Sequence, residues 1–174
     1  MSTAEAQKPS VRQRGFTLTR VLDASPDEVF RAWTDPDHLG WYFNDTMPVP
    51  DEPTTVDLRP GGEWRQMMVI DDETRFVTGG LYLEIDPPNR LVFAWGAVGG
   101  WPKLDPAKPQ DSPTVVMTLT GMGTRTAMTI DLDLPESMDE ATAKEWMESH
   151  VMQGWSDTID RVVAAYEGSP TTSG

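Results

Sequence analysis

The chain has 174 residues, with 14 Lys and Arg against 28 Asp and Glu, a net charge of −14, and no cysteine. This charge would repel phosphate backbones and anionic bilayers, so nucleic acid and membrane surfaces are excluded as partners. The lack of cysteine excludes disulfides and thiol chemistry. Because no apolar run reaches the length of a membrane span and no apolar signal core is present, we expect a soluble, cytoplasmic protein.

The length predicts one domain with a sizeable core. Residues 1–14 are polar and rich in small side chains, which is typical of a disordered N-terminal tail. We expect a single domain over residues 15–168 and a short C-terminal tail over residues 169–174.

The first elements are a strand and two short helices. Apolar and polar side chains alternate over residues 16–23, which predicts a strand. Ser25 and Glu28 then form a capping box, and Pro26 stands at the first helical position, so a helix begins there. Asp35-Pro36 ends that helix, and a second short one runs through Leu39.

The middle of the chain predicts a run of strands joined by tight turns. Apolar alternation in the last of them indicates a sheet with one wet face. Gly79-Gly80 is expected to mark a bulge or bend, and the Pro-rich segments 47–53 and 101–113 are expected to be loops. The predicted strands cover residues 56–59, 63–70, 75–85, 90–95, 114–120 and 124–134.

A long helix is predicted over Ser137–Glu167. Ser137 and Glu140 form a second capping box, and Gly168 stands where a left-handed C-terminal cap would fall. At 1.5 Å per residue this helix would be about 45 Å long, and Gly154 would allow it to approach its neighbours closely. Its apolar stripe consists of Met147, Val151, Trp155, Ile159, Val162 and Tyr166.

Segregated strands and helices predict the α+β class. The economical arrangement lays the long helix across a curved antiparallel sheet. Because a twisted sheet and a straight helix do not touch everywhere, a pocket roofed by the short helices is expected between them.

Several segments resemble one known superfamily. Residues 24–36 (ASPDEVFRAWTDP), Pro60-Gly61-Gly62, residues 80–93 and Gly154-Trp155 are similar to the SRPBCC (START-like, Bet v 1-like) superfamily, and within it to the branch related to the activator of Hsp90 ATPase. The resemblance implies the helix-grip fold, a curved antiparallel sheet of about six to seven strands around a long C-terminal helix. Two short helices follow the first strand, and an internal cavity lies between sheet and long helix.

We therefore expect binding of a small hydrophobic or aromatic molecule in that cavity. Seven tryptophans and ten methionines suit an adaptable apolar wall, although the same residues would also serve as ordinary core. Arg65, Glu148 or His150 would orient the ligand. The expected ligand-binding residues are Trp33, Trp41, Trp64, Met68, Phe93, Trp95, Trp101, Met117, Met128, Met147, Val151 and Trp155.

Trp101 lies in a Pro-rich segment without a regular core position. One hypothesis makes this segment a lid on the cavity mouth. The competing interpretation packs it permanently on the outer face of the sheet.

An enzyme on the same cavity is a second hypothesis, with a cyclase- or hydrolase-like reaction on a polyketide-type substrate. On a continuous helix Glu148 falls within the apolar stripe, where burial would raise its pKa and make it an acid or base. The competing interpretation leaves Glu148 at the solvent edge. His150 lies just off the stripe and is the other candidate catalytic residue.

No metal and no organic cofactor are expected, because the two histidines, His38 and His150, form no zinc-ligand pattern with the carboxylates. A third hypothesis is an interaction module like the Hsp90 activator, acting through its acidic surface. The sequence lacks the additional N-terminal domain of the eukaryotic activators, which argues against a chaperone partner. A homodimer through an exposed sheet edge is compatible with the sequence.

Overall fold

The structure is a computed structural model that describes residues 10–35, 54–69, 73–100, 102–149 and 151–165. The expected second short helix, together with His38, Trp41, Trp101, His150 and the loop at 47–53, lies outside the described residues.

The described elements follow the predicted succession of a strand, a short helix, a run of strands and a C-terminal helical region, and they add an N-terminal strand, a 3-10 helix and a division of that region into two helices. They are β1 (Ser10–Arg12), β2 (Gly15–Leu22), α2 (Pro26–Thr34), β3 (Thr55–Val56), β4 (Glu63–Val69), β5 (Arg75–Asp86), β6 (Arg90–Trp95), the 3-10 helix η2 (Pro109–Asp111), β7 (Thr114–Met122), β8 (Arg125–Asp133), α3 (Glu140–Glu148) and α4 (Val151–Ala165).

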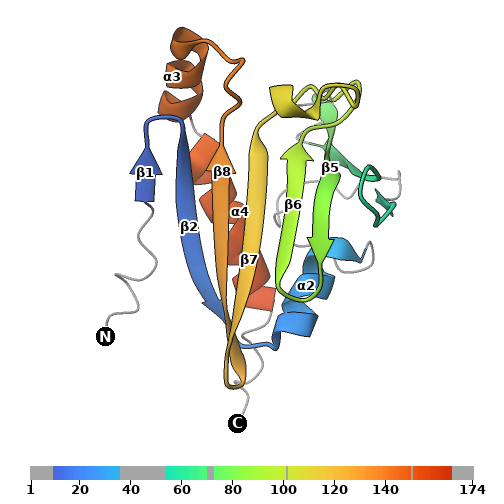
Figure 1. Cartoon of the computed structure of the whole chain (residues 1–174), viewed down its shortest axis with the longest axis vertical. Coiled ribbons are helices and arrows are strands. Elements are labelled where there is room, and N and C mark those ends of the chain that lie inside the picture. Colours follow the sequence, from blue (N-terminus) through green and yellow to red (C-terminus); the bar gives the residue numbers. More distant parts are fainter. Residues whose placement is uncertain (1–9, 36–53, 70–72, 101, 150, 166–174) are drawn as a thin grey trace.

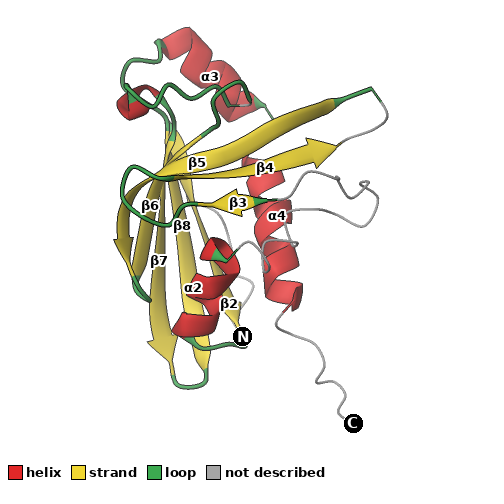
Figure 2. Cartoon of the chain, turned by 90° about the vertical axis from the view of Figure 1, so that its right-hand side faces the viewer, coloured by secondary structure: helices red, strands yellow, loops and turns green. Residues whose placement is uncertain are grey.

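The strands form one antiparallel sheet in the order β1-β2-β8-β7-β6-β5-β4-β3. The sheet is strongly curved, and α2 and α4 lie on the same side of it (Figures 1 and 2). Helix α4 packs on β2, and α2 packs on β7 and β8. The predicted α+β helix-grip fold is thereby confirmed.

Side-chain alternation gives the sheet a dry inner face and a wetter outer face. In β2 and β8 every second residue is buried, as the sequence predicts. Arg20 occupies an inner position of β2 beside Leu18 and Leu22, and it is 6% exposed. The inner face packs against Phe30 of α2 and Ile159 of α4, which belong to the same core cluster.

Helix α2 begins as its sequence predicts. The Ser25 hydroxyl accepts from the Glu28 backbone N–H, and the Glu28 side chain accepts in return from the Ser25 backbone N–H. The reciprocal bonds satisfy two backbone donors that a helix start otherwise leaves unpaired. This cap fixes where α2 begins, and thereby places Trp33 near its end, buried against the sheet.

The prediction of one continuous C-terminal helix is wrong. Asp139, not Ser137, caps the start of α3 by accepting from the Thr142 backbone N–H at 2.7 Å. The helix then ends at Glu148, because the Ser149 hydroxyl donates to the Trp146 carbonyl at 2.6 Å and accepts from the Val151 N–H at 3.3 Å. A serine that bonds to nearby backbone in this way offers the chain an alternative to the helical ladder. Helix α4 is therefore a separate element of about 22 Å.

Three smaller expectations are also corrected. Strand β1 lies within the segment expected to be a disordered tail, where Arg12 donates to Asp133 of β8 at 3.1 Å. The irregular register of β5 falls between Tyr82 and Glu84, not at Gly79-Gly80. Gly154 makes no close approach, since a Cβ placed there would meet nothing within 4 Å.

The described part of the second Pro-rich segment lies on the outer face of the sheet. Leu104 is 3% exposed and packs with Leu81 and Ala94, which alternate with the inner-face residues of β5 and β6. A backbone bridge between Ala97 and Lys103 holds the loop against itself. Leu104 thus packs on the outer face, whereas Trp101, on which the lid hypothesis depends, lies outside the described residues.

Candidate functional site

A row of four tryptophans runs through the inner side of the molecule. Trp33 stacks on Trp155 with ring centroids 6.4 Å apart and planes at 11°. Trp155 meets Trp95 edge to face at 5.2 Å, and Trp95 meets Trp146 in the same manner at 6.1 Å. Such edge-to-face and stacked pairs are favourable beyond the area they bury. The row therefore connects α2, α4, β6 and α3 through aromatic contacts.

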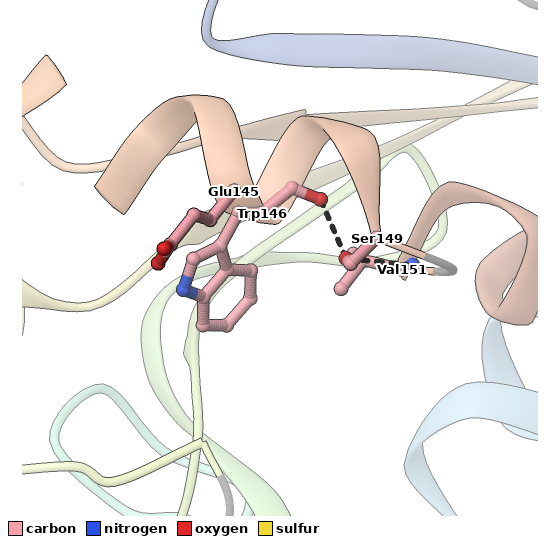
Figure 3. A pocket seen from close by; sticks show the side chains of 4 residues that line it. All are labelled: Glu145, Trp146, Ser149 and Val151. Carbon is pink, nitrogen blue, oxygen red and sulfur yellow. Dashed lines mark hydrogen bonds between the residues drawn. The ribbon is translucent and has the colours of Figure 1, made fainter. Parts of the chain in front are cut away.

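The outer end of this row forms the wall of a pocket. A hollow of about 250 Å³ lies where α3 gives way to α4, lined by Glu145, Trp146, Ser149 and Val151. Figure 3 shows Glu145 and Trp146 projecting from the same side of α3, with Ser149 and Val151 beyond the helix end. The break between the helices thus creates the pocket, because a continuous helix would carry no such gap.

The polar groups of this pocket are unevenly placed. The Ser149 hydroxyl is engaged by the backbone of Trp146 and Val151. Glu145 is exposed and places a carboxylate at the rim. The pocket can therefore offer an apolar wall, one aromatic face and a negative rim.

Two buried polar atoms lie in the core near the same row. Trp155 Nε1 and Tyr82 Oη have no hydrogen-bond partner within the described part of the chain. Tyr82 is fully buried on the inner face opposite Phe93, and burial, with a smaller contribution from the charge of Asp57, raises the pKa of the Tyr82 hydroxyl well above its usual value. Tyr82 therefore stays a neutral hydroxyl at physiological pH.

Two other buried polar side chains of the inner face, Arg20 and Gln66, are hydrogen-bonded. Arg20 donates from Nε to Asp160 at 2.7 Å and from Nη2 to Ser156 at 2.8 Å, which ties β2 to α4. Gln66 accepts from the Trp64 indole N–H at 3.2 Å. The Arg20 and Gln66 side chains are therefore already engaged within the protein.

The expected ligand-binding residues separate into three groups. Seven of them belong to the buried core: Trp33, Trp64, Phe93, Trp95, Met117, Met128 and Trp155. Met147 and Val151 are partly buried against that core, and Met68 is partly buried on β4. Trp41 and Trp101 lie outside the described residues. Among the expected residues that the structure describes, Val151 alone lines the pocket described above.

Trp146 is not among the residues that the sequence predicted for a site. A single helix phased on Met147, Val151 and Trp155 places Trp146 away from the stripe. The available signal was Ser149, whose type favours helix ends and turns. A helix that ends there frees α3 to turn Trp146 toward Trp95.

The polar candidates from the sequence lie away from a buried site. Glu148 is 68% exposed at its side chain and approaches Lys144 at 4.0 Å, so the expectation that it faces a cavity is wrong and the solvent-edge interpretation holds. Its burial was the premise of the acid–base hypothesis. Arg65 donates to the Val98 carbonyl at 3.2 Å in an exposed position. His150 lies outside the described residues.

Metal ligands are not gathered in the described ranges: no three His, Cys, Asp or Glu side chains there are placed to share an ion. No helix in the described part of the chain is long and apolar enough to cross a membrane.

Comparison with known proteins agrees with this geometry. The family model described as "Activator of Hsp90 ATPase homolog 1-like protein" matches residues 23–167. No curated protein matches the chain.

Solved structures share the fold. Protein Ms6760 from Mycobacterium smegmatis is 19% identical, with a TM-score of 0.70 over 93% of this chain and 97% of that one. Protein NE0264 from Nitrosomonas europaea is 24% identical, with a TM-score of 0.70 over 88% and 94%. A protein from Arthrobacter aurescens is 20% identical, with a TM-score of 0.71 over 92% and 91%. At these identities the likeness is one of fold alone. The family model matches most of this chain. The chain therefore belongs to the family of Activator of Hsp90 ATPase homolog 1-like proteins, and the solved structures agree in fold.

Proposed function

We propose that this protein binds a small hydrophobic or aromatic molecule in the pocket at the break between α3 and α4. The observation that carries the proposal is the contact between Trp146, in the pocket wall, and Trp95, in the buried aromatic row. A ligand on Trp146 would therefore meet aromatic surface that continues into the core.

The physical basis is burial of apolar area. Pockets for small molecules are mostly apolar, with few polar groups that orient the ligand. At roughly 25 cal/mol per Å² of apolar surface removed from water, burial of about 200 Å² would contribute about 5 kcal/mol before the entropy cost of association. Since a dissociation constant of 1 mM corresponds to about 4 kcal/mol, affinities in the millimolar range are within reach of such a pocket.

The test is a titration with N-phenyl-1-naphthylamine, a neutral apolar fluorophore whose emission rises when it leaves water. We expect saturable binding with one site per chain. Trp146→Ala should weaken binding about tenfold or more, because it removes the aromatic wall.

Met122→Ala is the matched control, since Met122 is a large apolar side chain that is 51% exposed at the β7–β8 turn. It should leave the affinity unchanged. Unsaturable binding, or equal affinities of wild type and Trp146→Ala, would contradict the proposal.

A further inference from the structure

The indole N–H of Trp155 is a buried donor without an acceptor. Trp155 is 5% exposed, and its Nε1 finds no hydrogen-bond partner within the described residues. An indole nitrogen can only donate. A buried donor left unpaired destabilises the folded state, so native structures seldom keep one without a reason.

Trp155 lies one helical turn from a residue of the pocket lining. Val151 lines the pocket, and Trp155 is one helical turn further along the same face of α4. Trp146 and Trp155 both pack on Trp95 and are its two neighbours in the aromatic row. A ligand that enters beside Val151 and Trp146 therefore approaches the ring of Trp155.

The T-shaped contact with Trp95 does not replace an acceptor. The two rings are inclined at 77° with centroids 5.2 Å apart, a geometry in which an N–H can at best point at an aromatic face. Bonds of that kind are weaker than an N–H···O bond. An oxygen supplied by a ligand would therefore compete successfully for the donor.

The charge of the protein selects the kind of oxygen. The net charge is −14, and the Glu145 carboxylate lies at the pocket rim. An anionic ligand would meet repulsion on approach and at the rim, whereas a neutral carbonyl would not. Tyr82 Oη, a neutral hydroxyl, is a second buried polar atom of this core without a partner in the described part of the chain.

We infer that the ligand is a neutral, largely apolar carbonyl compound whose oxygen accepts a hydrogen bond from Trp155 Nε1. This inference rests on the proposed function and adds the chemical class of the ligand and the residue that orients it. Trp155 is thus a specificity-determining residue, in addition to its place in the core.

Two probes of nearly equal shape test the inference: 1-indanone, which has a ring carbonyl, and indane, which has a methylene in its place. For wild type we expect 1-indanone to bind about tenfold more tightly than indane, as one added hydrogen bond to a buried donor predicts. In Trp155→Phe, which keeps an aromatic ring but loses the donor, the ratio of affinities should fall to near one. Met122→Ala, at an exposed side chain outside the pocket lining, is the control, and it should keep the tenfold ratio.

A second measurement uses wild type alone for its readout. In ¹H–¹⁵N NMR spectra the Trp155 indole resonance is the one that disappears in Trp155→Phe, and 1-indanone but not indane should shift it downfield. Any of three results would overturn the inference. The first is a ratio of 1-indanone to indane affinity near one in wild type, the second is a Trp155 resonance that does not move, and the third is a tenfold ratio that persists in Trp155→Phe.

The outcomes also separate the inference from the function on which it rests. If both probes bind with equal affinity, the inference fails and the proposed pocket stands. If neither probe binds, both are overturned.

Discussion

The indole rings of Trp33 and Trp155 stack with centroids 6.4 Å apart and planes at 11°. Trp33 comes from α2 and Trp155 from α4, so this pair joins the two helices across the inner face of the sheet. The two residues are far apart in the sequence. Their contact makes α2 and α4 parts of one core, and it predicts that truncation of either ring will destabilise the whole fold.

Trp155→Ala should lower the free energy of unfolding by about 3–5 kcal/mol, as truncation of a large buried aromatic side chain does. Trp155→Phe should cost clearly less, because an aromatic ring still fills most of the volume. Urea denaturation followed by circular dichroism measures both. Val98→Ala, at a side chain 45% exposed, should change stability by less than about 0.5 kcal/mol. Equal losses for Trp155→Ala and Val98→Ala would contradict the packing described here.

Substitution by alanine should change the stability of the fold in opposite directions at two glycines. A Cβ at Gly80 would lie 2.6 Å from Trp64 Cζ3 and 2.7 Å from Phe93 Cδ2, so Gly80→Ala should destabilise by about 1–3 kcal/mol through overpacking. At Gly154, in α4, the same atom meets nothing within 4 Å. Gly154→Ala should therefore stabilise by up to about 1 kcal/mol, because alanine is the better helix former. Thermal melts of the two variants and of wild type show whether each substitution raises or lowers the melting temperature.

The start of α3 predicts a pH-dependent contribution from Asp139. The hydrogen bond from the Thr142 backbone N–H holds the pKa of the Asp139 carboxyl below its usual value of 3.8. A carboxyl whose pKa is lower in the folded state contributes stability above the unfolded pKa, and this contribution is lost as the pH falls through the folded pKa. Asp139→Ala should therefore lower the melting temperature at pH 7, and the difference from wild type should shrink below about pH 3.8.

Ser137→Ala is the control for the cap, since Ser137 is the residue that a capping-box pattern selects and Asp139 is the residue that caps α3. It should melt like wild type. A larger loss of melting temperature for Ser137→Ala than for Asp139→Ala would instead indicate that Ser137 caps the helix.

The Arg20–Asp160 contact predicts a stabilising link between β2 and α4. Arg20 is buried, and its Nε donates to Asp160 at 2.7 Å, although the Asp160 side chain is 57% exposed. Asp160→Ala should cost about 1–2 kcal/mol, because it weakens the pairing of a buried guanidinium. Asp157→Ala, one turn away, removes a carboxylate whose described bond is to Gln153 on the surface, and it should cost less than about 0.5 kcal/mol. Denaturant titrations measure both losses of stability. Equal losses for Asp160→Ala and Asp157→Ala would contradict a stabilising link between Arg20 and Asp160.

Glu145 at the pocket rim predicts discrimination by ligand charge. Indane-1-carboxylate should bind several-fold more weakly than 1-indanone, and Glu145→Gln should narrow that difference because it removes one repulsive charge. Glu148→Gln changes the same charge at a position outside the pocket lining and should have a smaller effect. The affinities should be compared at low salt, where the screening of charge–charge interactions is weakest.

Local rules were sufficient for most of the elements. Alternation and turn residues predicted β6 at its observed bounds, and the Ser25 capping box predicted the start of α2. These features depend on neighbours within a few residues, which the sequence displays directly. The order of strands and helices, and with it the α+β class, followed from them.

The break at Ser149 and the pocket it creates were decided by tertiary structure. The apolar stripe of Met147, Val151 and Trp155 continues across the break, because α3 and α4 pack on the same core, so periodicity alone could not reveal two helices. Whether Trp146 faces solvent or Trp95 depends on a contact between residues distant in the sequence. By itself, therefore, the sequence determined most of the elements and the apolar character of the inner face, whereas long-range packing decided where the helices separate and where the pocket lies.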